Sequence, residues 1–194
     1  MTGIIILAAG SSTRLGSAKQ NLIYKGGTLL QKAVAAALGS VGETIVVVLG
    51  ANAGVIEPTI QNKPVHIVHN VDWEEGMASS IRIGIDALTK LEPKVNAVVL
   101  MLCDQPYVDA AVIDSLVTAK ANVAGCIAAC AYNDTVGPPA LFDACYFEEL
   151  LLLKGHDGAK KLMMKYINKV ISVPFVLGGV DIDTIADYDK LTNL

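Results

Sequence analysis

With 194 residues, 53% of them hydrophobic and only 18% charged, the chain is long enough for one domain with a large apolar core. Its net charge of −4 comes without a basic stripe, which argues against a nucleic-acid partner. No apolar run approaches the roughly 20 residues that cross a bilayer, and no basic segment precedes the short apolar start of the chain. We therefore expect a soluble, cytoplasmic protein with no membrane partner and a single domain over residues 1–194.

Short apolar runs alternate with segments of helical periodicity along most of the chain. The runs are rich in Val and Ile without polar alternation, which is typical of strands covered on both faces in a mostly parallel sheet. They span residues 3–9, 44–49, 65–69, 96–103, 124–131 and 170–176. Apolar stripes predict helices over residues 29–38, 79–91 and 109–120, the second capped by Ser79 or Ser80. This alternation favours an α/β fold, a Rossmann-like three-layer sandwich.

The rhythm changes from about Tyr132 onward. The stretch NDTVGPPALF, residues 133–142, contains consecutive prolines and predicts an edge hairpin or a loop. The stretch KGHDGAKKL, residues 154–162, predicts a glycine-rich loop that opens a helix. The four cysteines show neither a CxxC pair nor zinc-like spacing with His, so we interpret them as structural thiols.

The stretch LAAGSSTRLGSAKQN, residues 7–21, follows the first predicted strand and combines small residues with one Arg and one Lys. In open parallel sheets, ligands bind beyond the carboxyl ends of the strands. Backbone N–H groups of small residues can approach phosphate oxygens closely, and Arg14 and Lys19 add positive charge. We interpret the stretch as a phosphate cradle; the alternative is a glycine-rich turn with a solvated Arg and Lys. The small residues are Ala8, Ala9, Gly10, Ser11 and Ser12.

Two common phosphate-binding motifs do not fit this loop. A Walker A loop fails because Gly10 and Gly16 lie six residues apart and the lysine follows three residues later. A dinucleotide fingerprint fails because AAGSSTRLG lacks the first glycine pair and the second predicted strand ends in VVVLGAN, without an acid. The remaining pattern, L-A-A-G-x-S-x-R-x-G-x-x-K, resembles the signature loop of the MobA-like NTP transferases, and within them the molybdenum cofactor cytidylyltransferase branch.

Two further segments are similar to that family. WEEGMASSIRIG, residues 73–84, resembles the segment that enters the nucleobase pocket, and it also fits a plain helix N-terminus. VVLMLCDQPYV places Asp104 directly after an apolar strand, where a carboxylate suits Mg²⁺; the alternative is an Asx turn before Pro106. The resemblance implies nucleotide contacts from Leu7, Ala8, Ala9, Gly10, Ser11, Arg14, Lys19, Gly76, Met77, Ser79 and Ser80.

The C-terminal stretch VDIDTIADYDKL is similar to the closing D-x-D-T-x-x-D element of the same family. By that resemblance, Asp183 supplies the second carboxylate for Mg²⁺ beside Asp104, with Asp181 in reserve. The alternative interpretation is local, because Asp183 precedes the last predicted helix and suits its N-cap.

Two segments match the acceptor side of the cytidylyltransferase branch. They are GPPALF, residues 137–142, and GHDGAKKL, residues 155–162, where the usual pattern is G-D-x-G-A-[RK]. Here His156 stands in the place of the acid and Asp157 follows it, so Asp157 either contacts the acceptor or only caps the next helix. Backbone amides at a helix N-terminus favour an anionic acceptor. The resemblance implies acceptor contacts from Gly137, Pro138, Pro139, Gly158 and Lys160.

The resemblance implies a Mg²⁺-dependent nucleotidyltransferase with the nucleotide-diphospho-sugar transferase fold. An NMP, CMP from CTP in this branch, passes to a phosphate acceptor such as molybdopterin or the molybdenum cofactor, and pyrophosphate leaves. The attacking phosphate oxygen is already anionic, so the site must align and neutralise two polyanions rather than supply a base. Lys19, Arg14 and Asp104 are the expected catalytic residues.

Two other functions stay open at this point. One is a sugar-phosphate nucleotidyltransferase with the same loop. The other is a non-catalytic accessory protein that binds a pterin cofactor for a molybdenum hydroxylase, whose apoenzyme is then a partner. The residues do not distinguish CTP from GTP or ATP, because base choice depends on backbone geometry around the cradle and residues 77–80.

Overall fold

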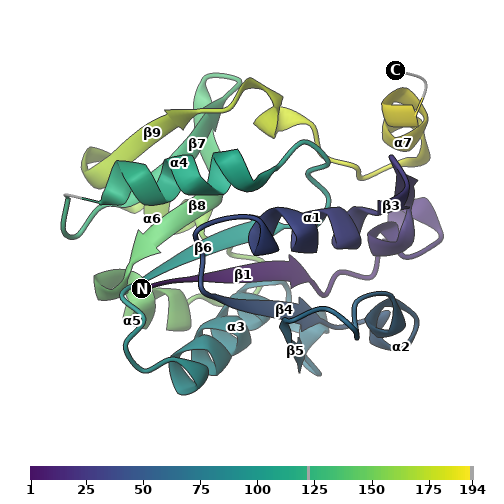
Figure 1. Cartoon of the computed structure of the whole chain (residues 1–194), viewed down its shortest axis with the longest axis horizontal. Helices are drawn as coiled ribbons and strands as arrows, with labels where there is room; N and C mark the ends of the chain where they lie inside the picture. Colours follow the sequence, from purple (N-terminus) through teal and green to yellow (C-terminus); the bar gives the residue numbers. More distant parts are fainter. Residues whose placement is uncertain (122, 193–194) are drawn as a thin grey trace.

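A seven-stranded sheet runs through the centre of the computed structural model, which describes residues 1–121 and 123–192 (Figure 1). The strand order is β5-β4-β1-β6-β8-β7-β9, and β8 alone runs antiparallel to its neighbours within these residues. The strands are β1 (Thr2–Ala8), β4 (Thr44–Leu49), β5 (His66–His69), β6 (Ala97–Leu102), β7 (Ile127–Tyr132), β8 (Thr135–Asp143) and β9 (Val170–Pro174). The expected mostly parallel α/β sheet is confirmed.

Helices cover both faces of this sheet and complete three layers. Helices α1 (Leu29–Leu38) and α4 (Ala110–Lys120) pack on one face, and α3 (Met77–Leu91), α5 (Phe147–Leu151) and α6 (Lys160–Lys165) pack on the other. Helix α2 (Ala53–Ile56) follows β4, and α7 (Ile185–Thr192) lies beside the small hairpin of β2 (Ile23–Tyr24) and β3 (Gly27–Thr28). None of the helices in the described ranges has both the length and the apolar character required to cross a bilayer.

The 3₁₀ turns of the described chain are η1 (Thr13–Leu15), η2 (Lys19–Asn21), η3 (Glu57–Thr59), η4 (Trp73–Glu75), η5 (Ala144–Tyr146), η6 (Ile167–Lys169) and η7 (Val176–Gly179).

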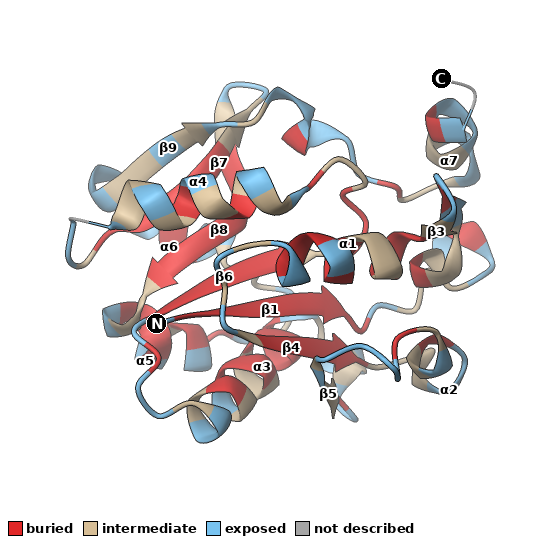
Figure 2. Ribbon diagram, viewed as in Figure 1, coloured by how far each residue is buried: buried red, intermediate tan, exposed pale blue. Residues whose placement is uncertain are grey.

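The continuous apolar runs of the central strands follow from burial on both faces. Along β1, Ile4 and Ile6 pack into the cluster under α1 and α4, whereas Ile5 and Leu7 pack into the cluster under α3 and α5. Successive side chains of a strand point to opposite faces, so every position of a doubly covered strand must be apolar. Figure 2 shows this burial in β1, β4 and β6, while the edge strand β9 is mostly half-buried.

The prediction of an edge hairpin or loop for residues 133–142 is right about the hairpin, since β8 pairs antiparallel with β7 across a turn at Asn133 and Asp134, but wrong about the edge. These residues include most of β8, which lies inside the sheet between β6 and β7. The register between β7 and β8 shifts where Ala129 pairs with Ala140 and Cys130 pairs with Gly137. Pro138 and Pro139 fall within that irregularity, and pairing with β6 starts only at Ala140. The two prolines therefore need no ladder donor, and an interior strand tolerates them.

Helix α3 begins two residues earlier than the sequence predicts, next to the predicted ligand site. Helix α3 begins at Met77 with Gly76 at its N-cap, so Ser79 and Ser80 lie inside the first turn and cap nothing. Helix α1 begins as expected, with a capping box between Thr28 and Gln31. The earlier start of α3 places the backbone of Gly76 and Met77 at the carboxyl end of the sheet, where ligands bind.

Candidate active site

The loop after β1 leaves three successive backbone amides free. The N–H groups of Gly10, Ser11 and Ser12 donate to no atom of the residues that the structure describes. The neighbouring carbonyls are occupied instead, because the Gln20 amide donates to the oxygens of Ala8 at 2.9 Å and Gly10 at 3.0 Å. Consecutive free amides of this kind form an anion-binding concavity.

Gln20 organises this loop, and the sequence analysis missed it. Its side chain is fully buried, and its oxygen lies 3.4 Å from the hydroxyl of Ser12, which itself accepts the Lys19 N–H at 3.1 Å. The signal in the sequence is a glutamine directly after the motif lysine, next to a loop of small residues. Gln20 thus couples the cradle to the turn that carries Lys19.

A cluster of opposite charges lies beside the cradle. The Lys19 ammonium contacts the carboxylate of Asp104 and lies 3.1 Å from that of Asp183, and Arg14 contacts Asp183 at 3.0 Å. These residues come from the loop after β1, the end of β6 and the segment before α7. The Lys19 and Asp104 side chains are mostly buried, whereas Arg14 is exposed. The fold thus brings together the three predicted catalytic residues and the second predicted metal ligand.

The charges of this cluster shift its titrations. Burial by itself lowers the pKa of Lys19, but the carboxylates of Asp104 and Asp183 outweigh burial and raise that pKa above its ordinary value. For Asp183, burial acts to raise the pKa, and contacts with Lys19 and Arg14 reverse the effect and lower it. Partial burial and the carboxylates of Asp104 and Asp183 raise the pKa of Asp181 to about 6. Lys19 therefore stays charged at neutral pH.

The local alternatives for the two aspartates do not fit their contacts. Asp104 makes no Asx turn among the described residues, because its Oδ2 contacts Lys19 and its Oδ1 is buried without a hydrogen-bond partner. Asp183 does not cap α7. Thr184 caps it instead, because its hydroxyl accepts a hydrogen bond from the Asp187 N–H at 3.2 Å. Both carboxylates are thus turned toward Lys19.

The two aspartates fit a divalent cation whose remaining ligands come from the substrate and water. An unpartnered buried carboxylate oxygen on Asp104 and a second carboxylate within reach of the same ammonium are suitable hard donors. No set of three or more metal-binding His, Cys, Asp or Glu side chains occurs in the part of the chain that the structure describes. This pattern suits Mg²⁺, which is commonly held by one or two carboxylates plus substrate phosphates.

A cavity of about 480 Å³ opens at the carboxyl ends of β1 and β6. Of the predicted nucleotide contacts, only Ser79 is absent from its lining. The Ser79 hydroxyl is buried, donates to the Gly76 oxygen at 2.8 Å and accepts from Asn70 at 2.8 Å. The lining also contains residues that the sequence analysis did not select for the nucleotide: Gln20, Trp73, Glu74, Leu102, Cys103 and His156.

A smaller cavity of about 260 Å³ adjoins the first one. Pro138, Gly158 and Lys160, three of the predicted acceptor contacts, line it. Gly137 and Pro139 do not line it, because they are buried within β8. Asp157 forms an ion pair with Lys161 at 2.7 Å and caps no helix. The residues that line both cavities are Leu7, Met77, Leu102 and His156.

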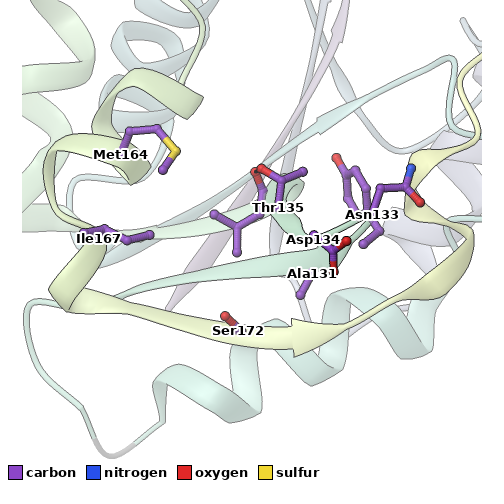
Figure 3. Close-up of a pocket in the computed structure, with 9 residues that line it drawn as sticks. Ala131, Asn133, Asp134, Thr135, Met164, Ile167 and Ser172 are labelled. Atoms are coloured by element: carbon purple, nitrogen blue, oxygen red, sulfur yellow. Dashed lines mark hydrogen bonds between the residues drawn. The ribbon is translucent and has the colours of Figure 1, made fainter.

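Another cavity, of about 520 Å³, lies elsewhere, between the β7–β8 hairpin and the segment of Met164 and Ile167 (Figure 3). Among its described lining residues, only Asp134 carries a charge. A binding site combines a cavity with several convergent polar groups, so the pair of cavities at the strand ends is the candidate site.

The chain is similar to known proteins in both sequence and structure. The chain is 28% identical to the nicotine blue oxidoreductase of Paenarthrobacter nicotinovorans, over 98% of this chain and 96% of that protein. It is 31% identical to the crystal structure of Rv0371c from Mycobacterium tuberculosis, with a TM-score of 0.83 and coverage of 100% and 98% of the two chains. A manganese complex of Rv0371c superimposes with a TM-score of 0.78 at 27% identity, over 99% and 98%.

More distant structures share the nucleotide-diphospho-sugar transferase fold of this chain. The family model of the MobA-like NTP transferase domain matches residues 4–170, which include the cradle, Asp104 and the loop of His156. The match covers well over half of the chain. The chain therefore belongs to the MobA-like NTP transferase domain family.

Proposed function

We propose that this protein transfers an NMP, CMP from CTP, to the terminal phosphate of a small acceptor and releases pyrophosphate. The observation that carries the proposal is the row of free amides at Gly10, Ser11 and Ser12 beside the Lys19–Asp104 pair. Free amides and a fixed ammonium bind a triphosphate, and a neighbouring buried carboxylate holds its counter-ion. We propose molybdopterin or the molybdenum cofactor as the acceptor.

The chemistry needs alignment and charge neutralisation. The cradle amides and Lys19 hold the triphosphate, and the exposed Arg14 neutralises the departing pyrophosphate. Asp104 and Asp183 would hold Mg²⁺, which supplies charge neutralisation at the transferring phosphate. The manganese complex of Rv0371c supports a divalent cation in this family. Because the attacking oxygen is already anionic, the site has no need of a nucleophilic side chain or general base.

The second cavity suits the acceptor. It is lined mainly by apolar side chains, with Lys160 and His156 as its titratable groups among the described residues. An acceptor with a flat or apolar body and an anionic end matches such a lining. His156 borders both cavities, so it lies where the acceptor phosphate must approach the nucleotide.

Three alternatives are less well supported. An oxidoreductase activity is suggested by the name of the Paenarthrobacter relative, but Gly50, Ala51 and Asn52 follow β4 without the carboxylate that binds the ribose in a Rossmann-type dinucleotide site. A non-catalytic cofactor carrier needs no cluster of Lys19, Asp104 and Asp183. A sugar-phosphate acceptor is disfavoured by the apolar lining of the second cavity.

A coupled assay of pyrophosphate release tests the proposal. CTP, GTP, ATP and UTP are each combined with Mg²⁺ and with molybdopterin or a sugar phosphate, and NADH oxidation is followed in parallel. We expect release with CTP and molybdopterin, and loss of turnover in Asp104→Ala with the fold retained by circular dichroism. Release with sugar phosphates alone would overturn the acceptor class, and an active Asp104→Ala protein would overturn the metal assignment.

A further inference from the structure

The N-terminus of α3 is joined to the loop of residues 153–158 by a network of polar contacts. The Glu75 carboxylate accepts two hydrogen bonds from the Arg82 guanidinium, at 2.8 and 2.5 Å, and a third from the Gly155 N–H at 3.1 Å. Arg82 also donates to the Leu153 oxygen at 2.7 Å, and the Ala78 N–H donates to the Gly155 oxygen at 3.1 Å. A forked pair of this kind is more directional than a single ion pair.

The backbones also approach each other closely at this junction. A Cβ on Gly76 would lie 2.5 Å from the Gly155 oxygen and 2.8 Å from the His156 ring, and the φ of Gly76 is +120°. Only glycine allows both this approach and this backbone angle. A Cβ on Gly158 would lie 3.0 Å from the Met77 sulfur. The loop therefore rests directly on the start of α3.

Leu153, at the start of this loop, is buried in the core under α3 and α5, but few other polar contacts tie the loop to the fold. Among the described residues, its hydrogen bonds beyond residues 150–162 go only to Glu75, Ala78 and Arg82. Hydrogen bonds from Arg82 and from the Gly155 amide lower the pKa of Glu75 to about 2, so the pair stays ionised at neutral pH. The loop carries His156, which lines both cavities, and Gly158, which lines the smaller one.

We infer that Glu75 and Arg82 are positioning residues for the acceptor. Their paired side chains hold the loop of residues 153–158 against α3, and thereby keep His156 and Gly158 at the junction of the two cavities. The inference rests on the proposed function, since it assigns the acceptor to the smaller cavity. Neither Glu75 nor Arg82 lines either cavity, so they act only through the loop.

Steady-state kinetics of pyrophosphate release tests this role. Glu75→Gln keeps an acceptor for the Gly155 amide but loses the ionic pair, and Arg82→Lys keeps the charge but loses the fork. Lys90→Gln is the matched control, because it breaks an exposed Lys90–Asp86 pair of 2.7 Å on the same helix. We expect a rise of about tenfold or more in the KM for molybdopterin in both variants, with the Kd for CTP unchanged and the control like wild type. An unchanged acceptor KM, or an equal loss of CTP binding, would overturn the inference.

Hydrogen exchange gives a readout that does not depend on transfer. We expect faster exchange in the peptide covering residues 153–158 of Glu75→Gln and Arg82→Lys, and wild-type exchange in Lys90→Gln. If the wild-type protein transfers no nucleotide, the proposed function fails, while exchange still tests the contact. Unchanged exchange in both variants would show that the pair does not hold the loop, whatever the activity.

Discussion

The Lys19 ammonium contacts the carboxylates of Asp104 and Asp183, and its positive charge offsets the repulsion between them. Asp104 is largely buried, and Lys19 is the only described residue that contacts its carboxylate. Removing the ammonium leaves a buried charge unpaired, which costs about 3 kcal/mol when water gains no access and less when it does. The same removal opens both carboxylates to another cation.

We therefore expect Lys19→Ala to abolish turnover, to lower the Tm, and to regain part of that Tm on addition of Mg²⁺. The rise with Mg²⁺ should exceed that of wild type, where Lys19 competes for the same oxygens. Differential scanning fluorimetry with a Mg²⁺ titration measures both effects. The double variant Lys19→Ala with Asp104→Asn should lose the extra rise, and an equal Mg²⁺ response in wild type and Lys19→Ala would contradict the metal assignment.

Gln20 supports a second residue-level prediction. Gln20→Ala leaves the buried carbonyl of Ala8 and the more exposed carbonyl of Gly10 without this donor, and one unsatisfied buried group costs about 1–3 kcal/mol. We expect a urea-unfolding free energy lower by about that amount and a weaker Kd for CTP. Gln61→Ala is the control, since Gln61 is an exposed glutamine remote in sequence from the cradle. Normal CTP affinity in Gln20→Ala would show that the cradle keeps its shape without this side chain.

Among the secondary-structure elements, α3 packs so closely on the sheet that one glycine determines the contact. A Cβ on Gly84 would lie 2.8 Å from Ile5 and 3.2 Å from Val48, both in the core. A Cβ on Gly54 in α2, by contrast, would have no other atom within 4 Å. The same substitution therefore meets opposite surroundings in two helices.

We expect Gly84→Ala to destabilise the protein, because overpacking costs about 1–3 kcal/mol and the gain in helix propensity returns only about 1 kcal/mol. Gly54→Ala should stabilise it by up to about 1 kcal/mol, since it gains the propensity without a clash. Urea unfolding of the two variants measures whether the free energy of unfolding falls in Gly84→Ala and rises in Gly54→Ala. A stabilised Gly84→Ala would mean that α3 can move away from β1 and β4 at little cost.

For the molecule as a unit, one continuous sheet links both core clusters, because alternate residues of β1 belong to each. This arrangement predicts a single cooperative unfolding transition for the one domain expected over residues 1–194. CTP with Mg²⁺ at a hundredfold excess over its Kd should stabilise that transition by about 2.7 kcal/mol. Calorimetry checks both expectations; two separate transitions, or a shift confined to one of them, would contradict the single domain.

The layered α/β fold could be predicted from the amino-acid sequence, since doubly buried strands need unbroken apolar runs and amphipathic helices need a period of 3.6. The proximity of the loop of residues 7–21 to Asp104 could be predicted as well, because both directly follow predicted strands whose ends must meet at one edge. The interior place of β8 could not, since only the register shift against β7 explains how two prolines fit.

Which polar groups meet became known only from the folded chain. The sequence analysis did not anticipate the hydrogen bonds of Gln20 or the contact of Lys19 with Asp183. It also did not anticipate the hydrogen bonds that join Glu75 and Arg82 to residues 153–155. Burial and periodicity can be predicted from the residues of one segment alone. A hydrogen bond between distant segments depends on where the whole chain places them, and no single segment encodes that distance.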